Sequence, residues 1–437
     1  MSSLFTKELL NKSKIGIFGL SRTGIATYRY LKDLAQNCIC FDDDKNKIQD
    51  FINQYDANHI ANLSNIIWKE LDMIVISPGI SHDHEIFHFG QKYNIKIVSD
   101  IDIFYNLLNP KKIVGITGTN GKSTTTKLIT HIMQSAGKDY VNGGNIGIAA
   151  MDLDPNKAGY ILELSSFQLD LINDLRLDVG VLLNITPDHL DRYSNMMDYI
   201  NSKKKIASII KPEGFLIICT DNSLLHKIYQ ELLFDQNYRN INILPLSSKI
   251  KSLSRISTQY GLHPENIAAS HHVCQILGVN SSDIKKYVTS FKQLKYRMEH
   301  VGSYHNNIHF YNDSKATNTV SSIYALTRLD NIYWLIGGIF KEADISRITP
   351  YLYRVNKIYI FGRDKLLLSQ LLMDKASYIL CENMSEAFNL AVDDAKNNLA
   401  KEDKNILLSP MSASTDQFKN FEDRGNKFTE LCGRFIH

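Results

Sequence analysis

Apolar residues in this chain fall into short runs that alternate with amphipathic segments. In the first hundred residues the apolar runs cover residues 14–18, 39–41, 73–76 and 95–98, and segments 24–34 and 84–93 have helical spacing. Short strands that alternate with amphipathic helices predict a parallel sheet with helices packed against it.

The same alternation resumes after a linker at residues 106–112, which contains Pro110 and two lysines. It predicts helices at 124–136 and 196–210, a break at 212–214, and strands at 113–116, 160–168, 179–185, 215–219 and 241–246. After Phe291 it predicts a helix at 385–399 and strands at 308–311, 332–336, 357–361, 378–380 and 406–408. We therefore expect an α/β protein of three domains, over residues 1–108, 109–293 and 294–437.

A glycine-rich turn with a lysine and a hydroxyl lies between the strand at 113–116 and the following helix: Gly115-Ile-Thr-Gly-Thr-Asn-Gly-Lys-Ser-Thr-Thr-Thr126. Free amides and the positive end of the helix dipole make such a turn an anion site. Lys122 would reach terminal phosphate oxygens, and Ser123 would place its hydroxyl on Mg²⁺. The glycine spacing departs from the common G-x-x-x-x-G-K-[ST] pattern, because residue 116 is Ile. We predict a nucleoside triphosphate site in a P-loop ATPase-like central domain, in preference to a turn that binds nothing.

The first turn of the chain, Gly19-Leu-Ser-Arg-Thr-Gly24, resembles a degenerate dinucleotide fingerprint. Ser21 stands where the middle glycine would be, and the acidic run that starts at Asp42 follows about 20 residues later, where a ribose-binding carboxylate would lie. The turn at Ser77-Pro-Gly-Ile80 should share the same carboxyl edge of the sheet. Two interpretations stay open, a Rossmann-like nucleotide or sugar site and a plain structural turn.

Other polar side chains follow predicted strands. Glu163 lies in the apolar strand at 160–168, where a carboxylate is costly unless it is paired or bound to metal. Lys203, Lys204 and Lys205 form a triplet on a predicted helix, which taken alone is usual for a solvated face.

Composition limits the possible classes of function. A net charge of +3, with 44% hydrophobic and 22% charged residues, fits an ordinary globular protein and gives no reason to invoke nucleic acid or an anionic membrane. The six cysteines form no C-x-x-C pair, which argues against a zinc site or a disulfide framework. Without a signal sequence or an apolar stretch of about 20 residues, we expect a cytoplasmic protein, as a monomer.

Together the motifs resemble those of the Mur ligases, and most closely the member that adds D-glutamate to UDP-N-acetylmuramoyl-L-alanine. The resemblance rests on six stretches: Gly118-Thr-Asn-Gly-Lys-Ser-Thr124, Gly143-Gly-Asn-Ile-Gly147, Glu163-Leu-Ser-Ser-Phe-Gln-Leu169, Asp188-His-Leu-Asp-Arg-Tyr193, Asn312-Asp-Ser-Lys-Ala-Thr-Asn318, and Ser409-Pro with 412–421. The strings Ser-Ser-Phe-Gln and Asp-Gln-Phe-Lys-Asn-Phe are specific to that member, and the Asp-Asn-Pro-Arg signature of the diamino-acid-adding member is absent.

The resemblance implies that the N-terminal Rossmann-like domain holds the UDP of the muramoyl substrate, the central domain holds ATP, and the C-terminal Rossmann-like domain brings the amino acid. It implies an ATP-binding set of Gly118, Thr119, Asn120, Gly121, Lys122, Ser123, Thr124, Asn266, Arg297 and Asp313. The UDP-substrate set is Ser21, Arg22, Thr23, Asp42, Ser77, Gly79, Asn145 and Ser165, and the D-glutamate set is Lys315, Thr317, Lys341, Ser414 and Phe421. Ser123, Glu163, His189 and a carbamylated Lys203 would hold two Mg²⁺ ions, and Lys122, Glu163, His189 and Lys203 would be catalytic. Lys203 is preferred over Lys204 and Lys205 because it occupies the lysine position of the family's Lys-x-x-Ile spacing, three residues before Ile206.

Three departures from the family pattern concern individual contacts. Ile339 stands where relatives usually have Asp, which affects how Lys341 is oriented. Tyr296 replaces the histidine usual before Arg297, and the turn at 261–266 is one residue short.

The expected chemistry runs through an acyl phosphate. The substrate carboxylate attacks the γ-phosphate of ATP, and the amine of D-glutamate then displaces phosphate. The third domain would have to close to bring amine and acyl phosphate within about 3–3.5 Å and to exclude water.

The alternatives are another Mur ligase or a folylpolyglutamate synthetase-like ligase, which would lack a UDP-facing first domain. A nicotinamide dehydrogenase would not need Lys122, and a nucleic-acid-binding ATPase would need a basic patch.

Overall fold

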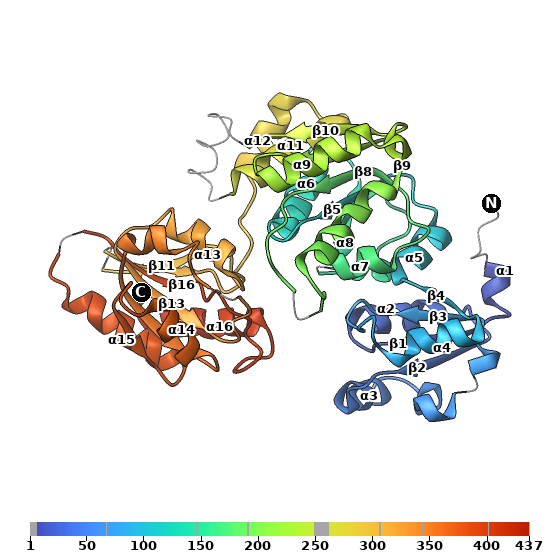
Figure 1. The fold of residues 1–437 in the computed structure, drawn as a ribbon, viewed down its shortest axis with the longest axis horizontal. Coiled ribbons are helices and arrows are strands. Elements are labelled where there is room, and N and C mark those ends of the chain that lie inside the picture. Colours follow the sequence, from blue (N-terminus) through green and yellow to red (C-terminus); the bar gives the residue numbers. More distant parts are fainter. Residues whose placement is uncertain are drawn as a thin grey trace. The chain divides into compact units, whose positions relative to one another are not determined.

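The computed structural model describes residues 7–436 apart from 67, 146, 190–191, 249–261, 306, 343 and 401. The short turn expected at 261–266 begins at Gly261, which lies outside the described residues, as do residues 190–191 of the Asp188–Tyr193 motif. The described residues form three β-sheets, each flanked by helices (Figure 1). The predicted α/β class with three domains is confirmed.

The first sheet has four parallel strands in the order β2-β1-β3-β4. Its strands read as nearly continuous apolar runs, as parallel strands covered on both faces do. The elements are α1 (Lys7–Leu10), β1 (Lys14–Phe18), α2 (Arg22–Leu31), β2 (Asn37–Phe41), α3 (Lys45–Ile52), η1 (Ala57–His59), η2 (Leu63–Asn65), η3 (Trp68–Glu70), β3 (Met73–Ile76), α4 (Glu85–Tyr93), β4 (Lys96–Val98) and α5 (Asp100–Leu108).

The second sheet has six parallel strands in the order β10-β9-β8-β5-β7-β6. Its central strand β5 carries the glycine-rich turn at its carboxyl end, with β8 on one side and β7 on the other. The elements are β5 (Ile113–Thr117), α6 (Lys122–Ser135), β6 (Tyr140–Gly144), η4 (Ala150–Asp152), β7 (Gly159–Glu163), α7 (Ser166–Leu171), β8 (Leu177–Leu182), α8 (Met196–Ser208), β9 (Ile210–Cys219), α9 (Ser223–Phe234), η5 (Gln236–Tyr238), β10 (Asn242–Leu246), α11 (Pro264–Ile276) and α12 (Ser281–Thr289).

The third sheet has the order β11-β12-β16-β13-β14-β15 and is parallel except for its first strand, β11, which pairs antiparallel with β12. Apolar clusters fill both of its faces around Trp334 and Phe388, which are fully buried. The elements are β11 (Glu299–Tyr304), β12 (Ile308–Asn312), α13 (Thr319–Leu326), β13 (Ile332–Gly337), η6 (Thr349–Arg354), β14 (Val355–Phe361), α14 (Lys365–Leu372), β15 (Tyr378–Leu380), α15 (Met384–Asn397), β16 (Lys404–Leu408) and α16 (Phe421–Cys432).

The chain divides into two compact units. The first comprises residues up to 185 and 195–291 and carries the first two sheets, and the second comprises residues 186–194 and 292 onward and carries the third. The expected boundaries at 108 and 293 remain predictions. In the part of the chain that the structure describes, no helix is long and apolar enough to cross a membrane. The six cysteines are all buried and none forms a disulfide.

Several sequence-based assignments are wrong in detail, among them the strand expected at 179–185, which is β8 and ends at Leu182. The strand expected within 160–168, with Glu163 at its end, is β7, which does end at Glu163; Ser165 and Gln168 then form a capping box that starts α7, so residues 166–168 are helical. The helix expected at 196–210 ends at Ser208, and Ile210 already pairs with Leu177. Gly143 and Gly144, the first residues of the glycine-rich stretch at 143–147, are the last residues of β6. The elements that were not anticipated include the strands β6 and β11 and the helices α3, α5, α7 and α9.

Candidate active site

The glycine-rich turn adopts a conformation that requires its glycines. Gly118 and Gly121 have φ angles of 149° and 84°, in the region that side chains avoid. A Cβ at Gly121 would overlap the Asn266 side-chain oxygen from α11. Helix α6 then begins at Lys122, so its free amides lie at the end of the central strand of the sheet.

Lys122 and Lys203 converge on the same carbonyl of this turn. Lys122 Nζ donates to Gly118 O at 2.9 Å and to Thr119 O at 2.8 Å. Lys203, from α8, is 1% exposed and donates to Gly118 O at 2.9 Å, with its Nζ 4.7 Å from the ring centroid of Tyr199. The Lys122 ammonium beside an anion-binding turn suits a polyphosphate.

The lysine triplet separates into one buried and two more exposed members. Lys204 pairs with Glu231 at 3.0 Å and Lys205 with Asp170 at 2.9 Å. The solvated-face interpretation therefore fits these two and does not fit Lys203.

Glu163 is a buried carboxylate with one unsatisfied oxygen. It ends β7 directly beside Ile116 of β5, and its side chain is 2% exposed. Oε1 accepts a hydrogen bond from Asn145 Nδ2 at 2.7 Å, whereas Oε2 has no hydrogen-bond partner. An orphaned carboxylate oxygen on the strand next to the glycine-rich turn fits a divalent cation, since Mg²⁺ prefers oxygen ligands. Ser123, at the second position of α6, adds a buried hydroxyl of the right kind.

His189 belongs to the second compact unit. Its φ is 54°, its amide donates to Asp188 Oδ1 at 2.9 Å, and its side chain is 41% exposed. Among the described residues, no group of three or more His, Cys, Asp or Glu side chains gathers as a metal site. The pairing of His189 with Lys203 around a second Mg²⁺ stays a prediction.

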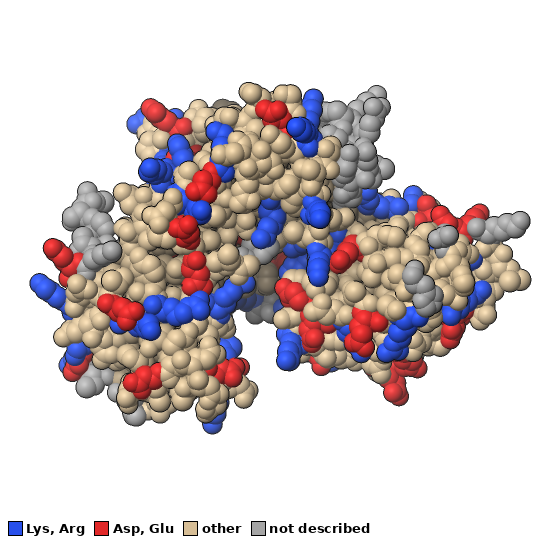
Figure 2. Space-filling view, turned by 180° about the vertical axis from the view of Figure 1, so that it is seen from behind, with Lys and Arg blue, Asp and Glu red and all other residues tan. Residues whose placement is uncertain are grey.

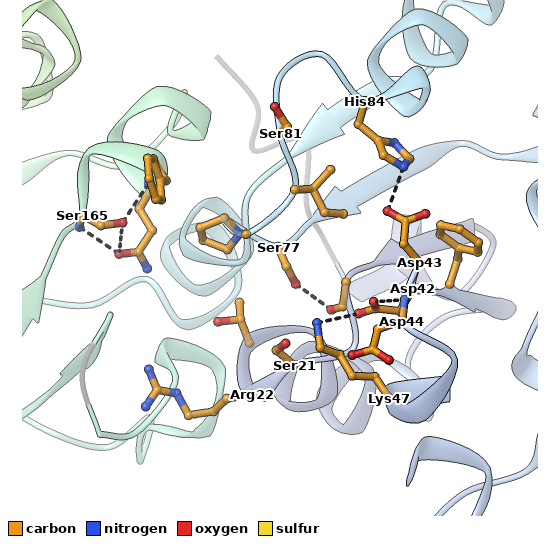
Figure 3. A pocket seen from close by; sticks show the side chains of 18 of the residues that line it. Ser21, Arg22, Asp42, Asp43, Asp44, Lys47, Ser77, Ser81, His84 and Ser165 are labelled. Atoms are coloured by element: carbon orange, nitrogen blue, oxygen red, sulfur yellow. Dashed lines mark hydrogen bonds and ion pairs between the residues drawn. The ribbon is translucent and has the colours of Figure 1, made fainter. Parts of the chain in front are cut away.

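A cavity of about 590 Å³ lies at the carboxyl edge of the first sheet and continues to the central domain (Figure 3). All eight residues predicted to bind the UDP substrate line it: Ser21, Arg22, Thr23, Asp42, Ser77, Gly79, Asn145 and Ser165. Arg22 donates to Asn145 O at 2.7 Å, so the two sides of the cavity are joined directly.

The walls of this cavity are braced by polar contacts. Asp42 accepts from Leu20 N at 2.6 Å and from Asp44 N at 2.9 Å, and Ser77 Oγ donates to Gly19 O at 2.7 Å. The turn at 19–24 is therefore structural, and it also lines a cavity. Among the lining residues that were not predicted are Asp43, Lys47, Ser81, His84, Phe167 and Gln168. Asp43 and Phe167 lie within motifs that were noted, whereas Lys47 and His84 carry no sequence signal.

The polar segments of the third sheet follow the neighbouring strands β12, β16 and β13, so they share one edge. Lys315 Nζ lies 4.0 Å from the ring centroid of Phe421, and Ser414 is buried in the loop after β16. Thr317 is half-buried after β12, and Lys341 is exposed in the loop after β13.

Asp313 has a structural role in this region. Its carboxylate accepts from Met298 N at 3.0 Å and Ser409 Oγ at 2.8 Å, next to the half-buried Arg297. Burial raises its pKa to about 7. Arg424, which was not predicted, is fully buried and donates to the carbonyls of Ser314 and Ser412, so it ties the loops together.

The two departures inside the described residues have local compensations. Ile339 pairs through its backbone with Ala413, and Phe340 N donates to Asp364 Oδ2 at 2.8 Å, so the loop before Lys341 is held without an aspartate at 339. Tyr296, with φ 62°, donates its hydroxyl to Asn426 Oδ1 at 2.7 Å.

Comparison with known proteins agrees with this geometry over most of the chain. The Mur ligase middle domain model matches residues 116–309, and the model of the MurD-like N-terminal domain of Mur ligases matches residues 13–99. The UDP-N-acetylmuramoylalanine--D-glutamate ligase of Rickettsia prowazekii (strain Madrid E) is 44% identical over 97% of this chain and 98% of its own. That of Wolbachia pipientis wMel is 33% identical over 97% of each.

Solved Mur ligases share the fold. MurF from Thermotoga maritima in complex with ADP aligns over 98% of this chain and 100% of its own, with a TM-score of 0.57 and 18% identity. MurC from Thermotoga maritima aligns over 97% and 99%, with a TM-score of 0.56 and 14% identity.

Proposed function

We propose that this chain, which belongs to the Mur ligase family, is an ATP-dependent ligase that adds D-glutamate to UDP-N-acetylmuramoyl-L-alanine in peptidoglycan synthesis. The observation that carries this function is sequence identity to relatives named UDP-N-acetylmuramoylalanine--D-glutamate ligase. Two of them are 44% and 43% identical over 97% of this chain. The convergence of Lys122 and Lys203 on one P-loop carbonyl, with an unsatisfied oxygen on Glu163 of the neighbouring strand, independently supports the use of ATP.

In the first step, the L-alanyl carboxylate attacks the γ-phosphorus of ATP, the bond to the bridging oxygen breaks, and ADP leaves. Lys122 and the free amides of α6 would stabilise the charge on the transferring phosphoryl group. Ser123 and Glu163 would hold Mg²⁺, which neutralises phosphate charge when bound. Gly118, Thr119, Asn120, Gly121, Thr124, Asn266, Arg297 and Asp313 complete the proposed ATP site.

In the second step, the amine of D-glutamate attacks the acyl-phosphate carbonyl, and phosphate leaves from a tetrahedral intermediate. Lys315 and Lys341 supply positive charge suited to the two carboxylates of D-glutamate. Thr317, Ser414 and Phe421 would complete that site. The 590 Å³ cavity, with Ser21, Arg22, Thr23, Asp42, Ser77, Gly79, Asn145 and Ser165, would hold the UDP-muramoyl substrate.

A carbamylated Lys203 and a second Mg²⁺ held with His189 belong to the same proposal. The burial of Lys203 supports it, because a fully buried ammonium is costly and a carbamate would convert it to an oxygen ligand. We further propose a cytoplasmic monomer with domain boundaries at 108/109 and 293/294.

The test is phosphate release from ATP with UDP-N-acetylmuramoyl-L-alanine and D-glutamate, L-glutamate or other amino acids. We expect release only with D-glutamate and only when the UDP substrate is present. Release with a folate acceptor and L-glutamate, and none with the UDP substrate, would favour a folylpolyglutamate synthetase-like activity instead.

A further inference from the structure

Asn184, just beyond β8, contacts the P-loop through both its backbone and its side chain. Its carbonyl accepts from Thr119 N at 2.8 Å. Its side-chain Oδ1 accepts from Asn120 N at 2.8 Å, and its Nδ2 donates to Asn120 O at 3.1 Å. Three backbone groups of the phosphate-binding turn are therefore held by one residue, 64 positions away in the sequence.

Glu265, at the start of α11, fixes which way the Asn184 amide faces. It is 7% exposed, and its Oε2 accepts the second hydrogen of Asn184 Nδ2 at 3.0 Å. A flipped amide would place Asn184 Oδ1 against two acceptors, Asn120 O and Glu265 Oε2. Only one orientation of the Asn184 amide satisfies every group. In that orientation its Oδ1 accepts from Asn120 N and its Nδ2 donates to Asn120 O.

The same helix also contacts the turn one residue further along. Asn266 is 5% exposed, and its Oδ1 lies so close to Gly121 that a Cβ there would overlap it. A Cβ on Gly118 would in turn meet Asn184 N and O at 3.2 Å. The end of β8 and the start of α11 thus fit closely against opposite ends of the turn that precedes Lys122.

We propose that Asn184 and Glu265 form a positioning pair that presets the P-loop for the triphosphate, with Glu265 acting through Asn184. The inference rests on the proposed ATP site. A P-loop must present the amides of residues 121–123 together, and a turn that is ordered before binding avoids the entropic cost of ordering it on the ligand. Neither residue needs to touch the nucleotide for this role.

The experiment measures the Kd of ADP with Mg²⁺ by isothermal titration calorimetry, with the KM for the UDP substrate as a second readout. Asn184→Ala should weaken ADP binding at least tenfold, because it frees the Asn120 peptide, with little change in that KM. Glu265→Ala should weaken it by about threefold to tenfold, and Glu265→Gln, which keeps a carbonyl acceptor, should remain within about twofold of the wild type. Asn237→Ala, at an exposed position, is the matched control.

The double variant Asn184→Ala/Glu265→Ala decides whether the two residues act together. If Glu265 acts through Asn184, the double variant binds ADP no more weakly than Asn184→Ala alone. Additive losses, or wild-type binding by Asn184→Ala, would overturn the proposal. If Asn184→Ala does not fold, equal affinities for Glu265→Ala and Glu265→Gln would overturn it.

Turnover by the wild type separates this inference from the proposed function. Wild-type turnover together with unchanged ADP binding in the variants would refute the positioning role of Asn184 and Glu265 and would leave the ligase assignment intact. An absence of turnover with every amino acid would remove the ligase assignment, while the binding comparison would still decide the role of Asn184.

Discussion

The Lys122 ammonium sits 2.9 Å from Gly118 O and 2.8 Å from Thr119 O, at the start of α6. Removing a preorganised cation from a phosphoryl-transfer site typically lowers kcat by about 10²–10³. We expect Lys122→Ala to lower kcat by that amount in the phosphate-release assay and to leave the melting temperature nearly unchanged. Lys227→Ala, on the exposed face of α9, is the control. Near-normal turnover by Lys122→Ala would contradict the phosphate role.

The three consecutive lysines of α8 provide a second prediction with internal controls. Lys203→Ala should lose most activity, because this side chain alone of the three reaches Gly118 O. Lys204→Ala and Lys205→Ala remove surface ion pairs worth about 0–1 kcal/mol each and should retain activity. A small added carboxylic acid should partly restore Lys203→Ala if Lys203 is carbamylated. Failure of that rescue would count against the carbamate and not against the fold.

Residues whose chemistry is local to a motif could be predicted from the sequence, and residues that act through tertiary contacts could not. Glycines, lysine and serine at fixed spacing identified the P-loop, and Glu163 was conspicuous as a carboxylate in an apolar strand. Asn184 and Glu265 carried no such signal, because their partners lie 64 and 81 positions away in the chain. Arg424 was missed for the same reason, since its partners Ser314, in the loop after β12, and Gly337, at the end of β13, are distant in the sequence.

At the scale of elements, apolar periodicity located most strands of the three sheets to within about two residues. Apolar periodicity failed where polar side chains or a bulge determine the backbone conformation. The Ser165–Gln168 capping box ended a run that reads as one strand, and β9 continues through Pro212 because residues 211–214 bulge opposite Asp178. The edge strand β11 was missed because only two of its residues, Val301 and Tyr304, are apolar or aromatic, and they do not alternate.

Helix α5, between the first two sheets, depends on one buried carboxylate. Asp102 is fully buried and accepts hydrogen bonds from the amides of Asn173, Asp174 and Leu175, at 3.0, 2.8 and 3.1 Å. Asp102→Ala would leave three amides without this acceptor, of which that of Leu175 is buried, so we expect a loss of about 2–3 kcal/mol in the free energy of unfolding. Urea denaturation measures it, with the exposed Asp33→Ala as control. Equal midpoints for the two variants would show that water replaces the carboxylate.

At the scale of the whole molecule, surface charge agrees with a small-molecule enzyme. On the face shown in Figure 2, Lys and Arg alternate with Asp and Glu over the described residues, and no broad basic surface of the kind that holds a nucleic-acid backbone is visible there. The full sequence has 49 basic and 46 acidic residues, which fits this mixture. The chemistry is instead concentrated at the carboxyl edges of the parallel strands, where loops from separate strands meet.

Buried carboxyl groups in three separate regions should make stability depend on pH in one direction. Burial raises the pKa of Asp100, Glu265 and Asp313 to about 7 each, above the value of an exposed carboxyl. Because the folded state keeps protons that the unfolded chain has released, the contribution of these three groups to stability should fall as pH rises from about 4 to 7 and then level off. Asp100 is the clearest case, since its Oδ1 has no hydrogen-bond partner and the side chain is 1% exposed.

Asp100→Asn tests this dependence directly, because an amide of the same shape carries no charge at any pH. The advantage of the variant over the wild type in free energy of unfolding should widen by about 2–3 kcal/mol between pH 5 and pH 8, as Asp100 ionises without a full set of partners. Denaturant titration at both pH values measures the difference, and Asp33→Asn, exposed on the surface, should show no such widening. If the advantage of Asp100→Asn is the same at both pH values, the buried carboxyl does not change its charge in that range. Glu265→Gln and Asp313→Asn then test the other two buried carboxyl groups in the same way.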